Sequence, residues 1–70
     1  MSDQAQPQFV DIVVGGNVCA FALDFHAKRW RAENADALRD LDEGDFPLVA
    51  TVAGERFLLY SDGTFAREEL

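Results

Sequence analysis

Two apolar segments on either side of a glycine pair constrain the fold of this chain more than any other feature. The first, residues 9–14, is rich in β-branched residues, and the second is residues 18–25. Gly15, Gly16 and Asn17 lie between them, and these residue types accept the positive φ angles of a tight hairpin turn. In the second segment large and small side chains alternate, which places the large ones on one face. The sequence therefore predicts a β-hairpin whose large face is buried.

The C-terminal half carries a similar pattern. Residues 48–53 and 56–60 are two further β segments around a Gly54–Glu55 turn. A second turn at 61–64 leaves Phe65 to begin a short last strand or to cover the core. For residues 26–32 the sequence leaves two secondary structures possible. Alternation favours continuation of the strand, and alanine and arginine favour the start of a helix.

One helix is expected between the two β regions. Asn34 is a good N-cap for a helix over residues 35–43, and Gly44 then supplies a left-handed stop. Ala37, Leu38 and Leu41 share one arc of this helix and form its buried stripe. Three carboxylates at i, i+4 and i+7 lie on the opposite side; they are Asp36, Asp40 and Glu43.

The order of these elements predicts an α+β fold. A small antiparallel sheet in the order β-β-α-β-β, with room for a fifth short strand, carries one amphipathic helix on one face, because short turns join neighbouring strands in antiparallel pairs. A chain of 70 residues makes one domain at most. We expect residues 1–8 to be a disordered lead-in and residues 9–70 to form that domain.

Negative charge is concentrated in one segment. Six carboxylates stand against one base, Arg39, between residues 33 and 45, which gives this segment a net charge of −5 out of −7 for the whole chain. Local charge of this kind steers a partner or repels a wrong one. The alternative is a solvated surface that keeps a small domain soluble. The six carboxylates are Glu33, Asp36, Asp40, Asp42, Glu43 and Asp45.

A short basic run precedes the acidic segment, with Lys28, Arg29 and Arg31 around Trp30. One interpretation is a nucleic-acid contact in which Trp30 stacks on a base. Three bases in an acidic chain make a poor electrostatic footprint, however. The favoured interpretation is local ion pairs with the acidic helix and a tryptophan at the edge of the core. Trp30 is also a candidate interface anchor, because tryptophan is enriched at binding hot spots.

No catalytic or metal-binding pattern is present in the sequence. Cys19 belongs to the large face of its segment and His26 has the opposite parity, which separates them as a nucleophile and base. The acidic segment lacks the alternating ligands and central glycine of a calcium loop. We therefore expect no enzymatic activity, no metal and no cofactor.

The sequence also predicts where the protein acts. A single cysteine allows no intramolecular disulfide and fits a reducing compartment. The first eight residues show no signal-peptide pattern, and no stretch approaches the about 18 apolar residues of a membrane span. We expect a cytoplasmic protein, in the host cell if it is encoded by a phage. Its charge disfavours direct binding to nucleic acid or to an anionic membrane.

With its small size, its acidic face carried by Asp36, Asp40 and Glu43, and no active site, the chain resembles the small acidic inhibitors encoded by bacteriophages, of which anti-CRISPR proteins are the best-known group. The resemblance implies a host nucleic-acid-binding complex as target, with occlusion of its DNA or RNA path by nucleic-acid mimicry. We expect a non-enzymatic inhibitor, monomeric or homodimeric, that binds a basic host protein or nucleoprotein complex through the six carboxylates and Trp30. The alternative is an interaction or oligomerisation module that pairs through an exposed strand edge.

Overall fold

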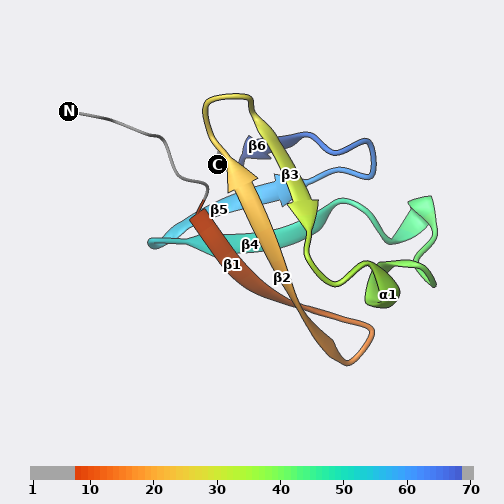
Figure 1. Ribbon diagram of the computed structural model, residues 1–70. Helices are drawn as coiled ribbons and strands as arrows, with labels where there is room; N and C mark the ends of the chain where they lie inside the picture. Colours follow the sequence, from red (N-terminus) through yellow and green to blue (C-terminus); the bar gives the residue numbers. More distant parts are fainter. Residues whose placement is uncertain (1–7, 69–70) are drawn as a thin grey trace.

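Two three-stranded antiparallel sheets make up most of the protein, as the computed structural model in Figure 1 shows. The structure describes residues 8–68. Sheet A has the strand order β1-β2-β3 and sheet B the order β4-β5-β6. The elements in chain order are β1 Gln8–Val14, β2 Asn17–Asp24, β3 Arg29–Ala32, α1 Ala35–Leu38, the 3-10 helix η1 Glu43–Asp45, β4 Leu48–Val52, β5 Glu55–Leu59 and β6 Phe65–Arg67.

The predicted hairpin is confirmed. β1 and β2 pair from Gln8 opposite Leu23 to Val14 opposite Asn17, where the hairpin closes. Gly15 and Gly16 form the turn with φ values of 57° and 88°, a region that a side chain with a Cβ rarely enters. A glycine with a positive φ angle also lies in the turn between β4 and β5, where Gly54 has a φ of 85°. The lead-in expected for residues 1–8 falls largely on residues 1–7, which lie outside the described residues, whereas Gln8 already belongs to β1.

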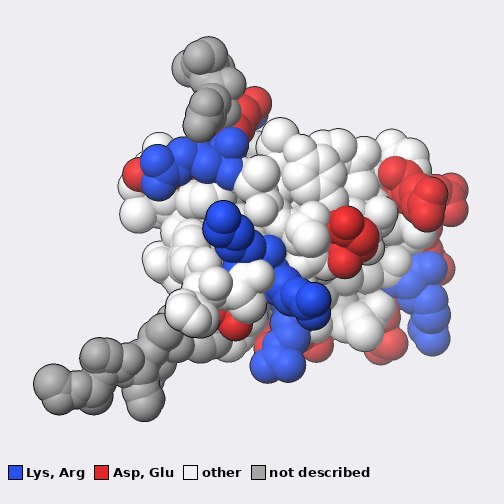
Figure 2. Space-filling model, turned by 90° about the horizontal axis from the view of Figure 1, so that it is seen from above, with Lys and Arg blue, Asp and Glu red and all other residues white. Residues whose placement is uncertain are grey.

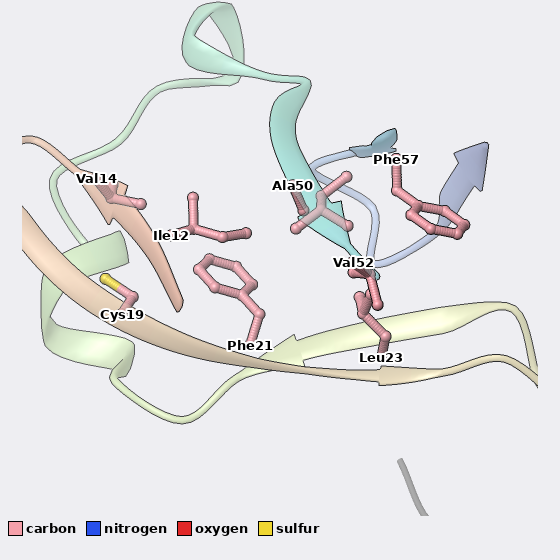
Figure 3. Close-up of a cluster of buried hydrophobic side chains, with 9 residues drawn as sticks. Ile12, Val14, Cys19, Phe21, Leu23, Ala50, Val52 and Phe57 are labelled. Carbon is pink, nitrogen blue, oxygen red and sulfur yellow. The ribbon is translucent and has the colours of Figure 1, made fainter. Parts of the chain in front are cut away.

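The core lies between the two sheets. Alternation along each strand turns one set of side chains inward, and those of sheet A meet those of sheet B in one cluster (Figure 3). Phe21, Leu23 and Leu59 are fully buried there, as is the thiol of Cys19. The members of the cluster are Ile12, Val14, Cys19, Phe21, Leu23, Ala50, Val52, Phe57 and Leu59.

The sheets are also joined at a corner where β3 meets the start of β6. Arg29 and Thr64 form an isolated antiparallel bridge, and the Trp30 N–H donates to the Gly63 carbonyl at 2.9 Å. The indole Nε1–H of Trp30 donates to the Tyr60 carbonyl at 3.0 Å. These bonds satisfy backbone groups that would otherwise be left at the sheet edges.

Phe25 forms a second link between the sheets although 44% of it is exposed. Its ring centroid lies 5.6 Å from that of Phe57 and 5.5 Å from that of Phe65, both in edge-on geometry. Edge-on pairs of this kind contribute about 0.5–1.5 kcal/mol beyond the area they bury.

We therefore expect Phe25→Ala to lower the free energy of unfolding by about 1–2 kcal/mol. Phe9→Ala is the matched control, because Phe9 is 57% exposed and has no aromatic partner among the described residues. The control should cost no more than about 0.5 kcal/mol. Urea denaturation followed by circular dichroism measures both values, and equal costs would show that the aromatic cluster contributes nothing.

The structure corrects the predicted fold class in its finer part. The described residues are mostly β, with six strands and little helix, rather than one sheet covered by an amphipathic helix. Residues 26–32 are not helical, since a turn at 25–28 leads into β3, which becomes the third strand of sheet A. The last strand at Phe65 is present as β6.

The predicted helix over 35–43 is wrong in length. α1 ends at Leu38 and buries no residue completely, and a separate 3-10 turn follows at Glu43. A helix of nine residues with three aspartates is marginal in water, because nucleation costs more free energy than so few hydrogen bonds return. Gly44 lies inside η1 and is not a left-handed stop.

Candidate protein-binding site

The acidic segment forms an irregular loop between β3 and β4, which we call the acidic loop (residues 33–45). It contains α1 and η1, and both lie at the same end of the molecule (Figure 1). Figure 2 shows carboxylates gathered at this end, with a run of Lys and Arg across the middle of the same view. The chain therefore presents charges of opposite sign on different parts of its surface.

Apolar residues hold the acidic loop against the body of the protein. Ala37, Leu38 and Leu41 are half-buried and pack against the core, as predicted for the buried stripe, although the helix ends at Leu38. The Asn34 side-chain amide donates to the Val18 carbonyl at 3.3 Å and ties the start of the loop to β2. Asn34 precedes α1 as predicted, but its side chain makes no cap hydrogen bond.

A second local contact shapes the far end of the loop. The Asp42 N–H donates to Asp45 Oδ2 at 2.9 Å, and the Asp45 N–H donates to the Asp42 carbonyl at the same distance. These two hydrogen bonds stabilise η1, so Asp45 helps to set the conformation of the acidic loop. Asp42 and Asp45 are nonetheless exposed.

Most of this negative charge is not neutralised by the protein itself. Arg39 approaches Asp36 at 3.8 Å, but the two side chains are 75% and 93% exposed, so the pair contributes little. Among residues 8–68 no other ion pair involves the acidic loop; the remaining two, Arg56–Glu68 and Arg67–Glu55, belong to sheet B.

The structure brings five of the six predicted carboxylates together. Asp36 lies in α1, Asp40 follows it, and the other three lie in or next to η1. Glu33 is separate, because its N–H donates to the Ala20 carbonyl at 2.7 Å and continues the β2–β3 ladder. The straight row predicted for Asp36, Asp40 and Glu43 is wrong, since the helix that would align them ends at Leu38.

Trp30, the seventh predicted site residue, is half-buried and packs against the hydrophobic core. Its ring lies 4.9 Å from that of Phe21 and stacks on Phe46 at 6.3 Å with an interplanar angle of 19°. With its Nε1–H bonded to Tyr60, the indole is held between the two sheets. The tryptophan at the edge of the core is therefore confirmed.

The local ion pairs expected for the basic run are not formed. Lys28, Arg29 and Arg31 are exposed, and none approaches a carboxylate within 4 Å in the part of the chain that the structure describes. The turn before β3 and the outward parity of Arg29 and Arg31 direct these side chains to the outer surface of sheet A. The pairing predicted from the sequence requires an acidic helix over residues 35–43, whereas α1 ends at Leu38.

Asp62 is a polar side chain outside the acidic loop, and its hydrogen bonds stabilise a turn. The Asp62 carboxyl accepts hydrogen bonds from the Thr64 hydroxyl at 2.6 Å and the Thr64 N–H at 3.0 Å, which lowers its pKa and fixes the β5–β6 turn. Within residues 8–68 no three His, Cys, Asp or Glu side chains lie close enough together to hold a metal ion. None of the helices described is long and apolar enough to cross a membrane.

No protein-family model, no curated protein and no solved structure matches this chain. The site is therefore interpreted from its own residues.

Proposed function

We propose that this protein is a non-enzymatic inhibitor whose acidic loop binds a basic, nucleic-acid-binding surface of a host protein or nucleoprotein complex in the cytoplasm. The observation that supports the proposal is the set of exposed carboxylates at one end of the fold. Within residues 8–68 they have one ion-pair contact, the 3.8 Å approach of Arg39 to Asp36. The resemblance to small phage-encoded inhibitors of the anti-CRISPR type belongs to the same proposal.

Electrostatics favours a protein partner over nucleic acid. Residues 36–45 carry five carboxylates and one arginine, a net charge of −4, which repels phosphates and attracts the cationic channel that would hold them. Such complementarity accelerates association and selects partners more than it strengthens the final complex. The half-buried Phe46, which follows the loop directly, supplies apolar contact area beside the charges.

The alternative function uses an exposed strand edge instead of charge. Part of the β3 edge is already occupied, because Trp30 donates its N–H to Gly63 and Arg29 bridges to Thr64. Pairing at a remaining edge would rest on main-chain hydrogen bonds, which salt screens little.

A pull-down with the full chain immobilised, from a bacterial lysate, separates the two functions. Between about 0.1 M and about 1 M salt the Debye length falls from about 10 Å to about 3 Å. We expect nucleic-acid-binding proteins to be retained at the lower concentration and lost at the higher one. Retention that does not change with salt would contradict the proposal and favour strand pairing.

A further inference from the structure

The outer edge of β1 is the longest strand edge that the described part of the fold leaves unpaired. β1 lies at the margin of sheet A, and its seven residues pair with β2 on one side only (Figure 1). Sheet B exposes shorter edges, since β4 has five residues and β6 has three. The edge of β3 is partly occupied, because Trp30 donates its N–H to Gly63. An added strand therefore finds the most room along β1.

The register of the hairpin shows which backbone groups of β1 face this edge. Opposite residues in an antiparallel pair of strands alternate between hydrogen-bonded and non-hydrogen-bonded pairs. The Glu33 N–H donates to the Ala20 carbonyl, so the backbone groups of Ala20 point toward β3. Asp11, which lies directly opposite Ala20, therefore directs its own N–H and C=O away from β2. Because the pattern has a period of two, the same holds for Phe9 and Val13.

These three residues leave a row of backbone groups without a neighbouring strand. None of the backbone hydrogen bonds outside the strand ladders of residues 8–68 involves Phe9, Asp11 or Val13. β1 pairs with β2 without a bulge, so the unpaired groups are regularly spaced. Such a row is a template for another extended chain, in which main-chain hydrogen bonds supply affinity and alternate side chains supply specificity.

The side chains of the same three residues give the edge a specific pattern. They share the outer face of sheet A, where Phe9 and Val13 are 57% and 68% exposed and Asp11 is exposed between them. No ion pair within 4 Å ties the Asp11 carboxylate to a cation elsewhere in residues 8–68. A strand whose side chains follow the order apolar, basic, apolar at every second position therefore complements all three.

We propose that the edge of β1 binds an extended segment of a partner protein as an antiparallel fourth strand of sheet A, and that Asp11 selects segments with a lysine or arginine at the centre. Antiparallel pairing continues the order of sheet A and places a partner side chain directly opposite each outward one. The net charge of −7 also favours a basic segment. This contact uses a surface other than the acidic loop and does not rest on the function proposed for that loop.

A second copy of the chain fits this edge less well. Two β1 strands in the antiparallel register that sets Phe9 opposite Val13 also set Asp11 opposite Asp11. Like charges directly opposite each other are unfavourable, and proteins place charges on edge strands to prevent self-pairing. The carboxylate that opposes self-association is thus the group that attracts a basic partner strand.

The test uses the full chain and a capped probe peptide in which threonines alternate with valine, lysine and valine, in that order. A matched peptide has glutamate in place of lysine. We expect the lysine peptide to bind at least about 5-fold more tightly than the glutamate peptide, because opposite charges replace like charges beside Asp11. Amide NMR spectra of the isotope-labelled protein measure both affinities, with the largest changes at Phe9, Asp11 and Val13.

Two variants identify Asp11 as the selecting group. Asp11→Lys should reverse the preference between the two peptides, while circular dichroism stays unchanged because Asp11 is exposed. Glu33→Lys makes the same charge change at the same level of sheet A, two strands or about 10 Å away. In about 0.15 M salt, where the Debye length is about 8 Å, this control should leave the preference within about 2-fold of the original.

N-methylated peptides distinguish strand pairing from contact between side chains alone. Methyl groups on the amides of the valines and the lysine, which face β1 in antiparallel pairing, should abolish binding. Methyl groups on the threonine amides, which face away, should weaken binding by less than about 3-fold. No binding of the lysine peptide, equal binding of the two peptides, or pairing of β1 with a second copy instead would overturn the proposal. Because no host target is added, that failure leaves the function proposed for the acidic loop untouched.

Discussion

Phe21→Ala should unfold much of the protein at 25 °C. Phe21 is fully buried at the centre of sheet A, opposite Val10 in β1 and Ala32 in β3, with its ring against Trp30. Truncation of a buried phenylalanine costs about 3–5 kcal/mol, because the transfer free energy is lost and a cavity remains. A domain of 70 residues has a total stability of about 3.5–10 kcal/mol at about 0.05–0.15 kcal/mol per residue.

Urea denaturation followed by circular dichroism measures this loss, with the same substitution at Phe9 as the control. Phe9 lies on the opposite face of the same sheet and is 57% exposed, so its truncation should change the stability of the monomer by no more than about 0.5 kcal/mol. With Phe25→Ala between them, the three variants should rank in the order of burial. A Phe21→Ala protein with wild-type stability would show that the inter-sheet core is misassigned.

The second large effect is expected on binding. The triple variant D36K/D40K/E43K changes the net charge from −7 to −1, because each reversal adds two charges. If each contact contributes about 1 kcal/mol, the variant should bind the target at least about 100-fold more weakly. The fold should persist, since all three side chains are exposed and none makes a cap hydrogen bond. Asp42 and Asp45 are left intact because they shape η1.

A matched pair of single variants distinguishes the effect of where a charge lies from the effect of the protein's net charge on binding. Asp40→Lys and Glu55→Lys each add two positive charges, but Glu55 lies in sheet B, where it pairs with Arg67 at 2.8 Å. Loss of that exposed pair costs no more than about 1 kcal/mol of stability. Calorimetric titration against the captured target should show weaker binding for the Asp40 variant alone. Equal weakening in both variants would mean that only the net charge matters.

Features set by local chemistry could be predicted from the sequence. The hairpin at Gly15–Gly16 and the turn at Gly54 depend on backbone angles that few other residues adopt, and both are present. β3 could not be predicted, because its pairing with β2 and its bridge to Thr64 are contacts between distant residues. Local propensity is a weak guide where tertiary pairing decides.

The same distinction applies to the candidate site. The charge of the acidic loop is a property of its composition and does not depend on the helix, whereas the alignment of its carboxylates required a helix longer than α1. The outer face of sheet A was missed for another reason. In β1 the buried Ile12 and Val14 alternate with the exposed Val13, so both parities are apolar and the sequence alone does not show which one faces outward.

The most direct test of the proposed function is a competition experiment with the protein recovered in the low-salt pull-down. A fluorescently labelled DNA or RNA bound to that protein is titrated with the wild-type chain, and anisotropy reports the bound fraction. The account predicts full displacement, with a midpoint that rises in proportion to the nucleic-acid concentration, and no displacement by D36K/D40K/E43K. A complex in which nucleic acid and the wild-type chain are bound together at saturation would contradict it.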